Sequence, residues 1–363
     1  MYLITNRALS NATSIRAFGA TPNPAGPNEL RLVEVTQKGT TWSVKQVNNQ
    51  LTPQVVKQLK QKFKLDIDES KDWHASLEVA CKLYERAQNE GKSILFFVHG
   101  YNNDVSDVIR AAEEIERLYN LIVVPFTWPA NGGGVVSGTA SYLSDKSDAR
   151  ASSGALNRFV EKVQFFHTLL TQAARTEIKA KVAQKFKNKD NPMASAELYT
   201  QLIGNACKVK ISLLCHSMGN YLLKHSLKTS DNATSQLVFD NVCLLAADTN
   251  NKDHASWVGQ IDARKRVYIV INEEDAALAA SRIKPGSQQG ARMGHCLREL
   301  NSQNAVYIDL TDENGIGLSH SYYKGNSVTD NPAVMHLFDT MFNGLAVEKQ
   351  LTCATGNAPH RLK

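Results

Sequence analysis

Residues 209–220 read Val-Lys-Ile-Ser-Leu-Leu-Cys-His-Ser-Met-Gly-Asn, and this stretch decides the class of fold. Val209 to Leu214 is a short run that is apolar almost throughout, which is typical of a strand covered by helices on both faces. A helix is expected to begin near Met218. Ser217 therefore lies in the turn between a buried strand and the helix that follows it.

Similar short runs recur along the chain, and turn-like segments and helical stretches follow most of them. The expected strands span residues 93–98, 121–127, 209–214, 242–246, 266–271 and 305–310. The segments between them are long enough for crossover helices, which favours parallel pairing. The predicted fold class is therefore α/β, a doubly wound and mostly parallel sheet.

The first ninety residues show a different pattern. Shorter strands are expected over 2–8, 30–36 and 41–47, joined by a turn-rich region at 19–28. They predict an antiparallel part of the sheet, followed by a helix over 75–87 with Asp72 as N-cap or Ser70 as the alternative start. The expected organisation is 1–90 as N-terminal strands and helix, 91–345 as the core, and 346–363 as a C-terminal tail.

Residues 152–174 carry a helical stripe of apolar side chains, which predicts a crossover helix. The segment 174–206 that follows is the candidate for a lid. Its lysines predict either a solvated face or a helix that contacts an anionic membrane surface, and the solvated face is favoured because a run of lysines is by itself a weak binding signal. These lysines are Lys179, Lys181, Lys185, Lys187 and Lys189.

Composition excludes several classes of protein. The chain has 41 Lys plus Arg against 35 Asp plus Glu, a formal charge of +6 that is too mild to indicate a nucleic-acid partner. Its apolar runs are far shorter than the ~20 residues that cross a bilayer, and the N-terminus lacks a signal-peptide pattern, so a cytoplasmic protein is expected. The six cysteines form no metal-site pattern, and no nucleotide-binding loop is present. No metal and no cofactor are expected.

Ser217 is the candidate nucleophile. The strand-turn-helix pattern around it is typical of a nucleophile elbow, G-x-S-x-G, in which small residues let strand and helix approach closely. Gly219 keeps the second small position, and Cys215 stands where the first glycine would be. The elbow would present the Ser217 hydroxyl above the sheet and place the Met218 amide at a helix N-terminus, where it can donate to an oxyanion.

A second oxyanion donor is expected from the turn after residues 93–98. His99-Gly100 begins this turn, and the backbone N–H of Tyr101 is the preferred donor, with Asn102 as the fallback. An ordinary strand-to-loop turn would show the same residues. The functional interpretation is favoured because the elbow is also present.

A serine hydroxyl needs a histidine base and a carboxylate that orients the base, in the chain order Ser, acid, His. Asp275 and His320 follow strands at the expected carboxyl edge and complete this order. Asp248 is the competing acid, and chain order favours Asp275. Four other histidines have settings that suit a base less well than that of His320: His216, His225, His295 and His336. Side chains expected to border the substrate are His99, Asn102, Trp128, His216 and Asp248.

Over residues 95–322 the chain resembles the alpha/beta hydrolase fold, and within it a bacterial family of unknown function. The motifs that carry the resemblance are His99-Gly100-Tyr101-Asn102, Phe126-Thr127-Trp128-Pro129, Tyr142-Leu143-Ser144-Asp145, His216-Ser217-Met218-Gly219-Asn220, Ala246-Ala247-Asp248, Asp275-Ala276-Ala277-Leu278 with Ser281, Ala291-Arg292-Met293-Gly294 and Gly317-Leu318-Ser319-His320-Ser321-Tyr322. The resemblance implies Ser217, Asp275 and His320 as a triad. Two residues depart from the family pattern. The family more often has Ala or Gly at the position of Cys215, and Pro at the position of Ala247.

The expected function is hydrolysis of a carboxylic ester or thioester, in a small molecule or a lipid, through an acyl-enzyme. Two alternatives stay open. One is a non-catalytic binding or scaffold protein on the same fold, since a fold alone does not determine activity. The other is a lipase or acyltransferase that works at a membrane surface through the lysine-rich segment.

Overall fold

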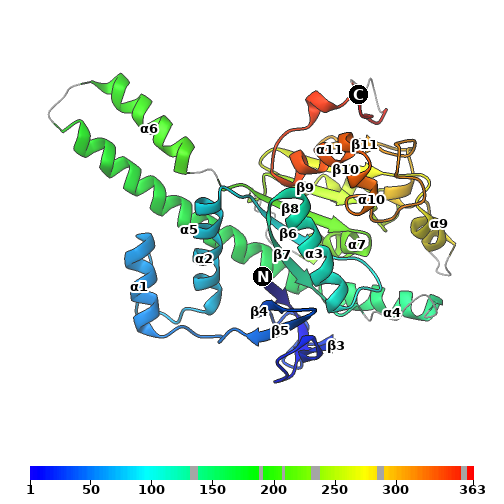
Figure 1. Ribbon diagram of the computed structural model, residues 1–363, viewed down its shortest axis with the longest axis horizontal. Helices are drawn as coiled ribbons and strands as arrows, with labels where there is room; N and C mark the ends of the chain where they lie inside the picture. The colour runs from blue at the N-terminus through cyan, green and yellow to red at the C-terminus, as the bar shows by residue number, and fades with distance from the viewer. Residues whose placement is uncertain (131–137, 188–190, 207–208, 230–237, 284–289, 353–357) are drawn as a thin grey trace.

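In the computed structural model, strand β8, which leads into Ser217, lies near the middle of a nine-stranded sheet (Figure 1). The strand order is β11-β10-β9-β8-β6-β7-β1-β4-β5, and β2 pairs with β3 in a separate small sheet. The structure describes residues 1–130, 138–187, 191–206, 209–229, 238–283, 290–352 and 358–363.

The elements have the following bounds. The strands are β1 (Tyr2–Thr5), β2 (Arg7–Leu9), β3 (Phe18–Pro22), β4 (Arg31–Lys38), β5 (Thr41–Gln46), β6 (Ile94–Val98), β7 (Ile122–Thr127), β8 (Ile211–His216), β9 (Asn241–Leu245), β10 (Arg266–Ile271) and β11 (Ala305–Asp309). The helices are α1 (Pro53–Phe63), α2 (Ala75–Glu90), α3 (Val105–Tyr119), α4 (Gly138–Ala151), α5 (Ser153–Lys185), α6 (Pro192–Ala206), α7 (Met218–Thr229), α8 (Ala255–Val258), α9 (Ala276–Arg282), α10 (Asn326–Thr329) and α11 (Pro332–Phe342), with short 3₁₀ turns at Ile15–Ala17, Met293–His295 and Glu348–Gln350.

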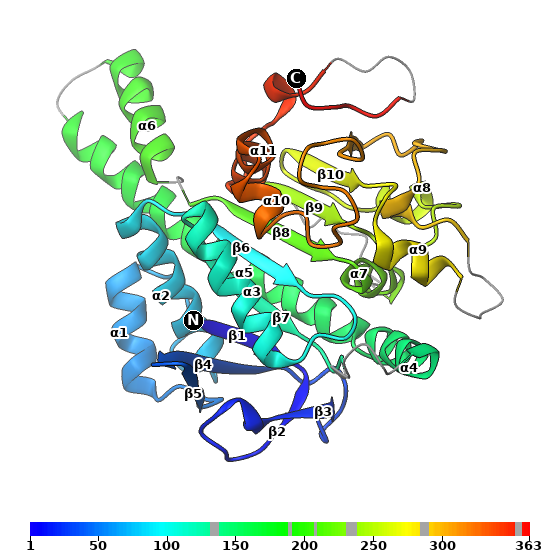
Figure 2. The same cartoon turned by 45° about the vertical axis from the view of Figure 1, so that its right-hand side comes forward.

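The six strands expected in the core all form, and they pair in parallel. Every residue of β6, β7, β8 and β9 is buried, as expected of strands with helices on both faces. One apolar cluster joins the sheet to α2, α5 and α7, and a second joins its other face to α3 and α11 (Figure 2). The α/β fold class is confirmed.

The N-terminal part is antiparallel where it was expected to be, since β1 pairs with β4, and β4 with β5. The predicted strand over 2–8 is divided in two. Asn6 interrupts it, because its side-chain amide is directed to the Pro27 carbonyl and the Ser152 hydroxyl. The predicted cap of α2 was wrong: His74 is the N-cap residue, and Asp72 instead accepts a hydrogen bond from Gln50 at 2.7 Å.

Helix α5 does not end near residue 174 but continues to Lys185 and forms a hairpin with α6 (Figure 1). The chain passes from α6 into the amino end of β8, whereas Ser217 follows the carboxyl end of that strand. In both views the hairpin projects from the end of the sheet opposite α7 and α9. In this arrangement the candidate lid segment lies toward the opposite end of the sheet from α7, the helix that follows Ser217.

The lysines of that segment lie on α5 and just beyond it. Lys179 and Lys185 are exposed, and Lys181 pairs with Glu177 at 2.7 Å, one helical turn earlier. Lys189 lies outside the described residues. In the described ranges no helix has both the length and the apolar character needed to cross a bilayer.

The C-terminal segment packs against the last strand of the sheet. His360 donates its backbone N–H to Tyr307, and its carbonyl accepts from Asp309. Arg361 pairs with the side chain of Asp309 at 2.6 Å. Residues 360 and 361 are thus anchored to β11. Because β11 is the edge strand, this segment covers that edge of the sheet.

Candidate active site

Ser217 occupies a strained turn between β8 and α7. Its φ of 55° lies in the left-handed region, which costs a residue other than glycine about 1 kcal/mol or more. The neighbouring strand end sustains this conformation: Ser217 N–H donates to the Leu245 carbonyl at 3.0 Å, and the Asp248 N–H donates to the Ser217 carbonyl at 3.1 Å. Such a turn projects a serine hydroxyl away from the sheet.

Two glycines make the turn sterically feasible. A Cβ on Gly219 would lie 2.6 Å from the carbonyl oxygen of Val98, so only glycine lets α7 approach β6 this closely. A Cβ on Gly100 would lie 2.7 Å from Ser217 Cβ and 3.1 Å from its Oγ. The turn after β6 is therefore in direct contact with the Ser217 side chain.

His99 holds that turn in place. Its Nε2 accepts a hydrogen bond from the Trp128 backbone N–H at 3.2 Å. Its Nδ1 therefore carries the proton, which it donates to the Gly100 carbonyl at 2.9 Å. The indole of Trp128 stacks on the imidazole with ring centroids 5.2 Å apart, and its Nε1 donates to the His99 carbonyl.

Burial, together with the charge of Arg7, lowers the pKa of His99 to about 3, so its ring is neutral at physiological pH. His99 and Trp128 are 1% and 0% exposed. Both had been expected to border the substrate, but the packing uses them to fix the turn instead. In this structure neither side chain is exposed at a surface that a substrate could reach.

Asn102 was expected to be the fallback oxyanion donor after Gly100. The Asn102 amide donates to Asp145 at 3.1 Å, and Asn102 itself has a φ of 58°. The backbone N–H of Asn102 is therefore already used in a hydrogen bond within the protein. At the other side of Ser217, no hydrogen bond among the described residues uses the N–H of Met218, the first residue of α7.

Asp275 and His320 are in contact. The Oδ1 of Asp275 caps α9 by accepting from Ala277 and Leu278, at 2.9 and 3.0 Å. The helix thus fixes the carboxylate and leaves Oδ2 directed at His320 Nδ1, 2.7 Å away. Asp275 is fully buried, while the His320 side chain is 25% exposed. With Nδ1–H donated to the carboxylate, Nε2 of His320 keeps a lone pair that can accept a proton.

Two residues outside the predicted set position the His320 loop. Asn272, at the end of β10, donates to the carbonyls of Gly317 and Ser319 on either side of the loop. The Tyr322 hydroxyl donates to the Val270 carbonyl and accepts from the Ala246 N–H, at 2.9 and 2.8 Å. Asn272 precedes Asp275 by three residues, and that proximity is the only signal the sequence offers for it.

His216 links the elbow to the same loop. Because a carbonyl can only accept, the 3.0 Å contact between His216 Nε2 and the His320 carbonyl identifies Nε2 as the donor. The two imidazole rings are 4.7 Å apart between centroids. Burial, followed by the adjacent His320, lowers the pKa of His216 well below its usual value. His216 is 5% exposed, as is Ser217, and its ring packs against His320.

Asp248 belongs to a separate buried network. It pairs with Arg292 at 3.0 Å and accepts from the hydroxyls of Ser281 and Tyr142, at 2.6 and 3.0 Å. Burial, with Asp248 nearby, raises the pKa of Tyr142 to about 12, so the phenol remains a donor. Asp248 thus holds together α4, α9 and the segment before Met293. The Asp248 side chain is thus occupied by this network, and its contacts with Ser281, Tyr142 and Arg292 were not predicted.

The described ranges hold no cluster of metal-ligating side chains. They contain no group of three or more His, Cys, Asp or Glu that could hold an ion. Four cysteines there are free and buried, namely Cys81, Cys215, Cys243 and Cys296. This edge of the sheet brings together a serine in an elbow, an imidazole paired with a carboxylate, and two turns next to the serine.

The parallel sheet with a strained serine after a central strand defines the class of the alpha/beta hydrolases. The chain belongs to the family described as alpha/beta hydrolase of unknown function (DUF900), which matches residues 77–169 and 161–336. The expected family is thus confirmed, and membership supports a hydrolase. No curated protein and no solved structure matches the chain.

Proposed function

We propose that this protein is a serine hydrolase that cleaves a carboxylic ester or thioester through an acyl-enzyme. The observation that carries the proposal is the Asp275–His320 hydrogen bond of 2.7 Å at the edge where Ser217 occupies its elbow. His216 is adjacent to Ser217 and contacts His320, so base and nucleophile belong to one cluster.

In the proposed reaction Ser217 Oγ attacks the carbonyl carbon while His320 Nε2 accepts the hydroxyl proton. His320 then donates this proton to the departing alcohol or thiol, which leaves the acyl group on Ser217. Water, deprotonated by the same nitrogen, releases the acid. Asp275 keeps His320 in the Nδ1–H tautomer and stabilises the imidazolium that forms in each step.

The oxyanion of each tetrahedral intermediate would be held by the amides of Tyr101 and Met218. Tyr101 follows Gly100, whose backbone contacts Ser217, and Met218 is at the N-terminus of α7. Losing one such donor costs roughly 10²- to 10³-fold in rate, so the precise placement of both turns matters for catalysis. His99 and Trp128 would contribute by holding the first turn.

Labelling with a fluorophosphonate probe tests this function. The full chain and the variants Ser217→Ala, His320→Ala, Asp275→Asn and Asp248→Asn are incubated with the probe, then analysed by intact mass and peptide mapping. A single label at Ser217, absent in the first two variants and strongly slowed only in Asp275→Asn, supports the proposal. A folded wild-type chain that takes no label would contradict it and favour a binding protein.

A further inference from the structure

A pocket of 260 Å³ lies between helices α2 and α5 and one face of the sheet. Its floor includes Phe96, Val124 and Ile211 from three strands, and its walls include Val79 and Leu83 of α2 and Phe159 of α5. These side chains are buried members of the largest apolar cluster. An empty space with such a lining lacks packing contacts, so an apolar ligand there would be stabilised.

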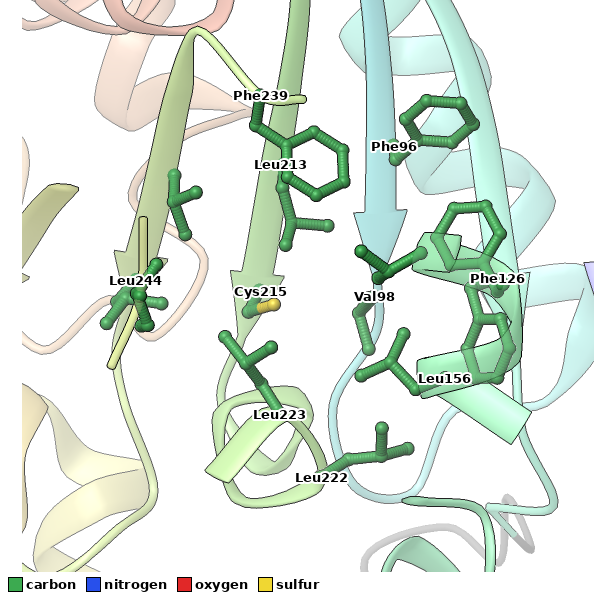
Figure 3. Packing of buried hydrophobic residues seen from close by; sticks show 14 of the residues in the cluster. Phe96, Val98, Phe126, Leu156, Leu213, Cys215, Leu222, Leu223, Phe239 and Leu244 are labelled. Atoms are coloured by element: carbon green, nitrogen blue, oxygen red, sulfur yellow. The ribbon is translucent and has the colours of Figure 1, made fainter. Parts of the chain in front are cut away.

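This pocket is distinct from the candidate active site. It is lined by Ile94 and Phe96 of β6 and by Ile211 of β8, but not by Val98 or His216 at the carboxyl ends of those strands. Figure 3 shows Val98 and Cys215 further along their strands than Phe96, with Leu156 of α5 beside them, on the side toward the helix that carries Leu222. Packed side chains therefore fill the space toward Ser217.

The polar rim of the pocket is positively charged. Arg31 and Arg158 share one acidic partner, Glu29, at 3.6 and 2.8 Å. Lys162, one turn of α5 beyond Arg158, also lines the pocket, is exposed, and forms no ion pair with the described residues. Three cations against one carboxylate leave a net charge of +2 beside an apolar interior.

We infer that this pocket binds an amphiphile with one alkyl chain and an anionic head, of the fatty-acid type. The chain would occupy the apolar interior and remove its surface from water, while the carboxylate would lie at Lys162 and Arg158. The volume is slightly below the range of about 300–1,000 Å³ typical of drug-sized ligands, which fits a single chain rather than a two-chain lipid. This site is independent of the proposed chemistry at Ser217.

Isothermal titration calorimetry with dodecanoate, on the full chain, tests the inference. Saturable binding of one molecule per chain is expected, with weaker binding of neutral dodecanol and weakest binding of cationic dodecylamine. The same titration on Ser217→Ala and on fluorophosphonate-treated protein is expected to give unchanged affinity. Loss of dodecanoate binding after labelling of Ser217 would place the ligand in the other site and overturn the inference.

Variants locate the ligand. Val163→Trp, on the α5 wall, is expected to fill the pocket and abolish binding of dodecanoate and dodecanol alike, and Ala80→Phe on α2 serves the same purpose should the first variant misfold. Lys162→Gln is expected to weaken dodecanoate binding by about twofold to fivefold and to leave dodecanol unaffected. Lys179→Gln, an exposed lysine of the same helix outside the pocket, is the matched control.

Two results would refute a ligand site here. Absence of saturable dodecanoate binding by the wild-type chain is the first. Equal dodecanoate affinity in wild type and in a folded pocket-filling variant, verified by circular dichroism, is the second.

Discussion

His216 donates from Nε2 to the backbone carbonyl of His320 across 3.0 Å, and so joins the residue before the candidate nucleophile to the candidate base. The bond links the elbow after β8 to the loop after β11. These two strands are not neighbours in the sheet, because β9 and β10 lie between them. The depressed pKa of His216 keeps this imidazole neutral, so it serves as a donor without adding a second charge beside His320.

Removing this link is expected to lower the rate of reaction at Ser217 without abolishing it. In His216→Ala the carbonyl of His320 loses its partner and the loop is less well held, so the rate of fluorophosphonate labelling is expected to fall about tenfold. His225→Ala, a change on helix α7 after the elbow, is the control. Identical labelling rates in His216→Ala and wild type would show that the contact does not position His320.

The two buried aspartates are expected to fail in different ways when changed to asparagine. Asp275→Asn keeps the volume and one cap acceptor but loses the charge beside His320, so activity is expected to drop by about 10³- to 10⁴-fold with little change in stability. Asp248→Asn leaves Arg292 buried without its carboxylate, which costs about 3–5 kcal/mol of unfolding free energy. Esterase rates and urea unfolding of both variants separate the two effects, and a reversed pattern would exchange the roles assigned here.

The glycine that contacts Ser217 is expected to be intolerant of a single methyl group. In Gly100→Ala the new Cβ would start 2.7 Å from Ser217 Cβ, so either the turn or the elbow must shift. The labelling rate is expected to fall by about 10²-fold, comparable to loss of one oxyanion donor. Gly290→Ala, where a Cβ meets nothing within 4 Å, is the control. Full activity of Gly100→Ala would show that this turn takes no part in the reaction.

Acid is expected to destabilise the protein through its buried neutral histidines. The pKa of His99 is lowered to about 3 in the folded chain, against about 6.5 when unfolded, so between these values only the unfolded chain binds the proton. The contribution of neutral His99 to the free energy of unfolding is fully present above pH 6.5. It is lost as the pH falls toward 3, by about 1.4 kcal/mol per pH unit. His216 acts in the same direction.

Urea unfolding at several pH values between 7 and 4.5 measures this dependence. In His99→Gln the slope of unfolding free energy against pH is expected to be smaller than in wild type by up to about 1.4 kcal/mol per unit. The variant is also expected to be less stable at pH 7, since Trp128 and Gly100 lose their shared partner. An unchanged slope would mean that the pKa of His99 does not differ between the folded and the unfolded chain.

Much of the fold could be predicted because it depends on local patterns. The parallel strands are short apolar runs buried on both faces, and their side chains alone indicate this. The boundaries of α5 could not be predicted from the apolar stripe at 152–174, because Ile178 and Val182 are buried in the second half of the helix among more numerous lysines. When α6 is not considered, the sequence of that half of α5 is typical of a solvated segment.

The sequence by itself determined the serine elbow and the His-Gly turn, since each depends on residues that are neighbours in the chain, and chain order alone led to the prediction of Asp275 and His320 as partners of Ser217. Only the tertiary structure decided which aspartate contacts His320, that His99 and Trp128 hold a turn, and that 174–206 projects from the far end of the sheet. Those outcomes depend on pairs such as Asp275 with His320 and Tyr142 with Asp248, which are 45 and 106 residues apart. Contacts at such separations form only when packed elements bring them together, and no local pattern encodes them.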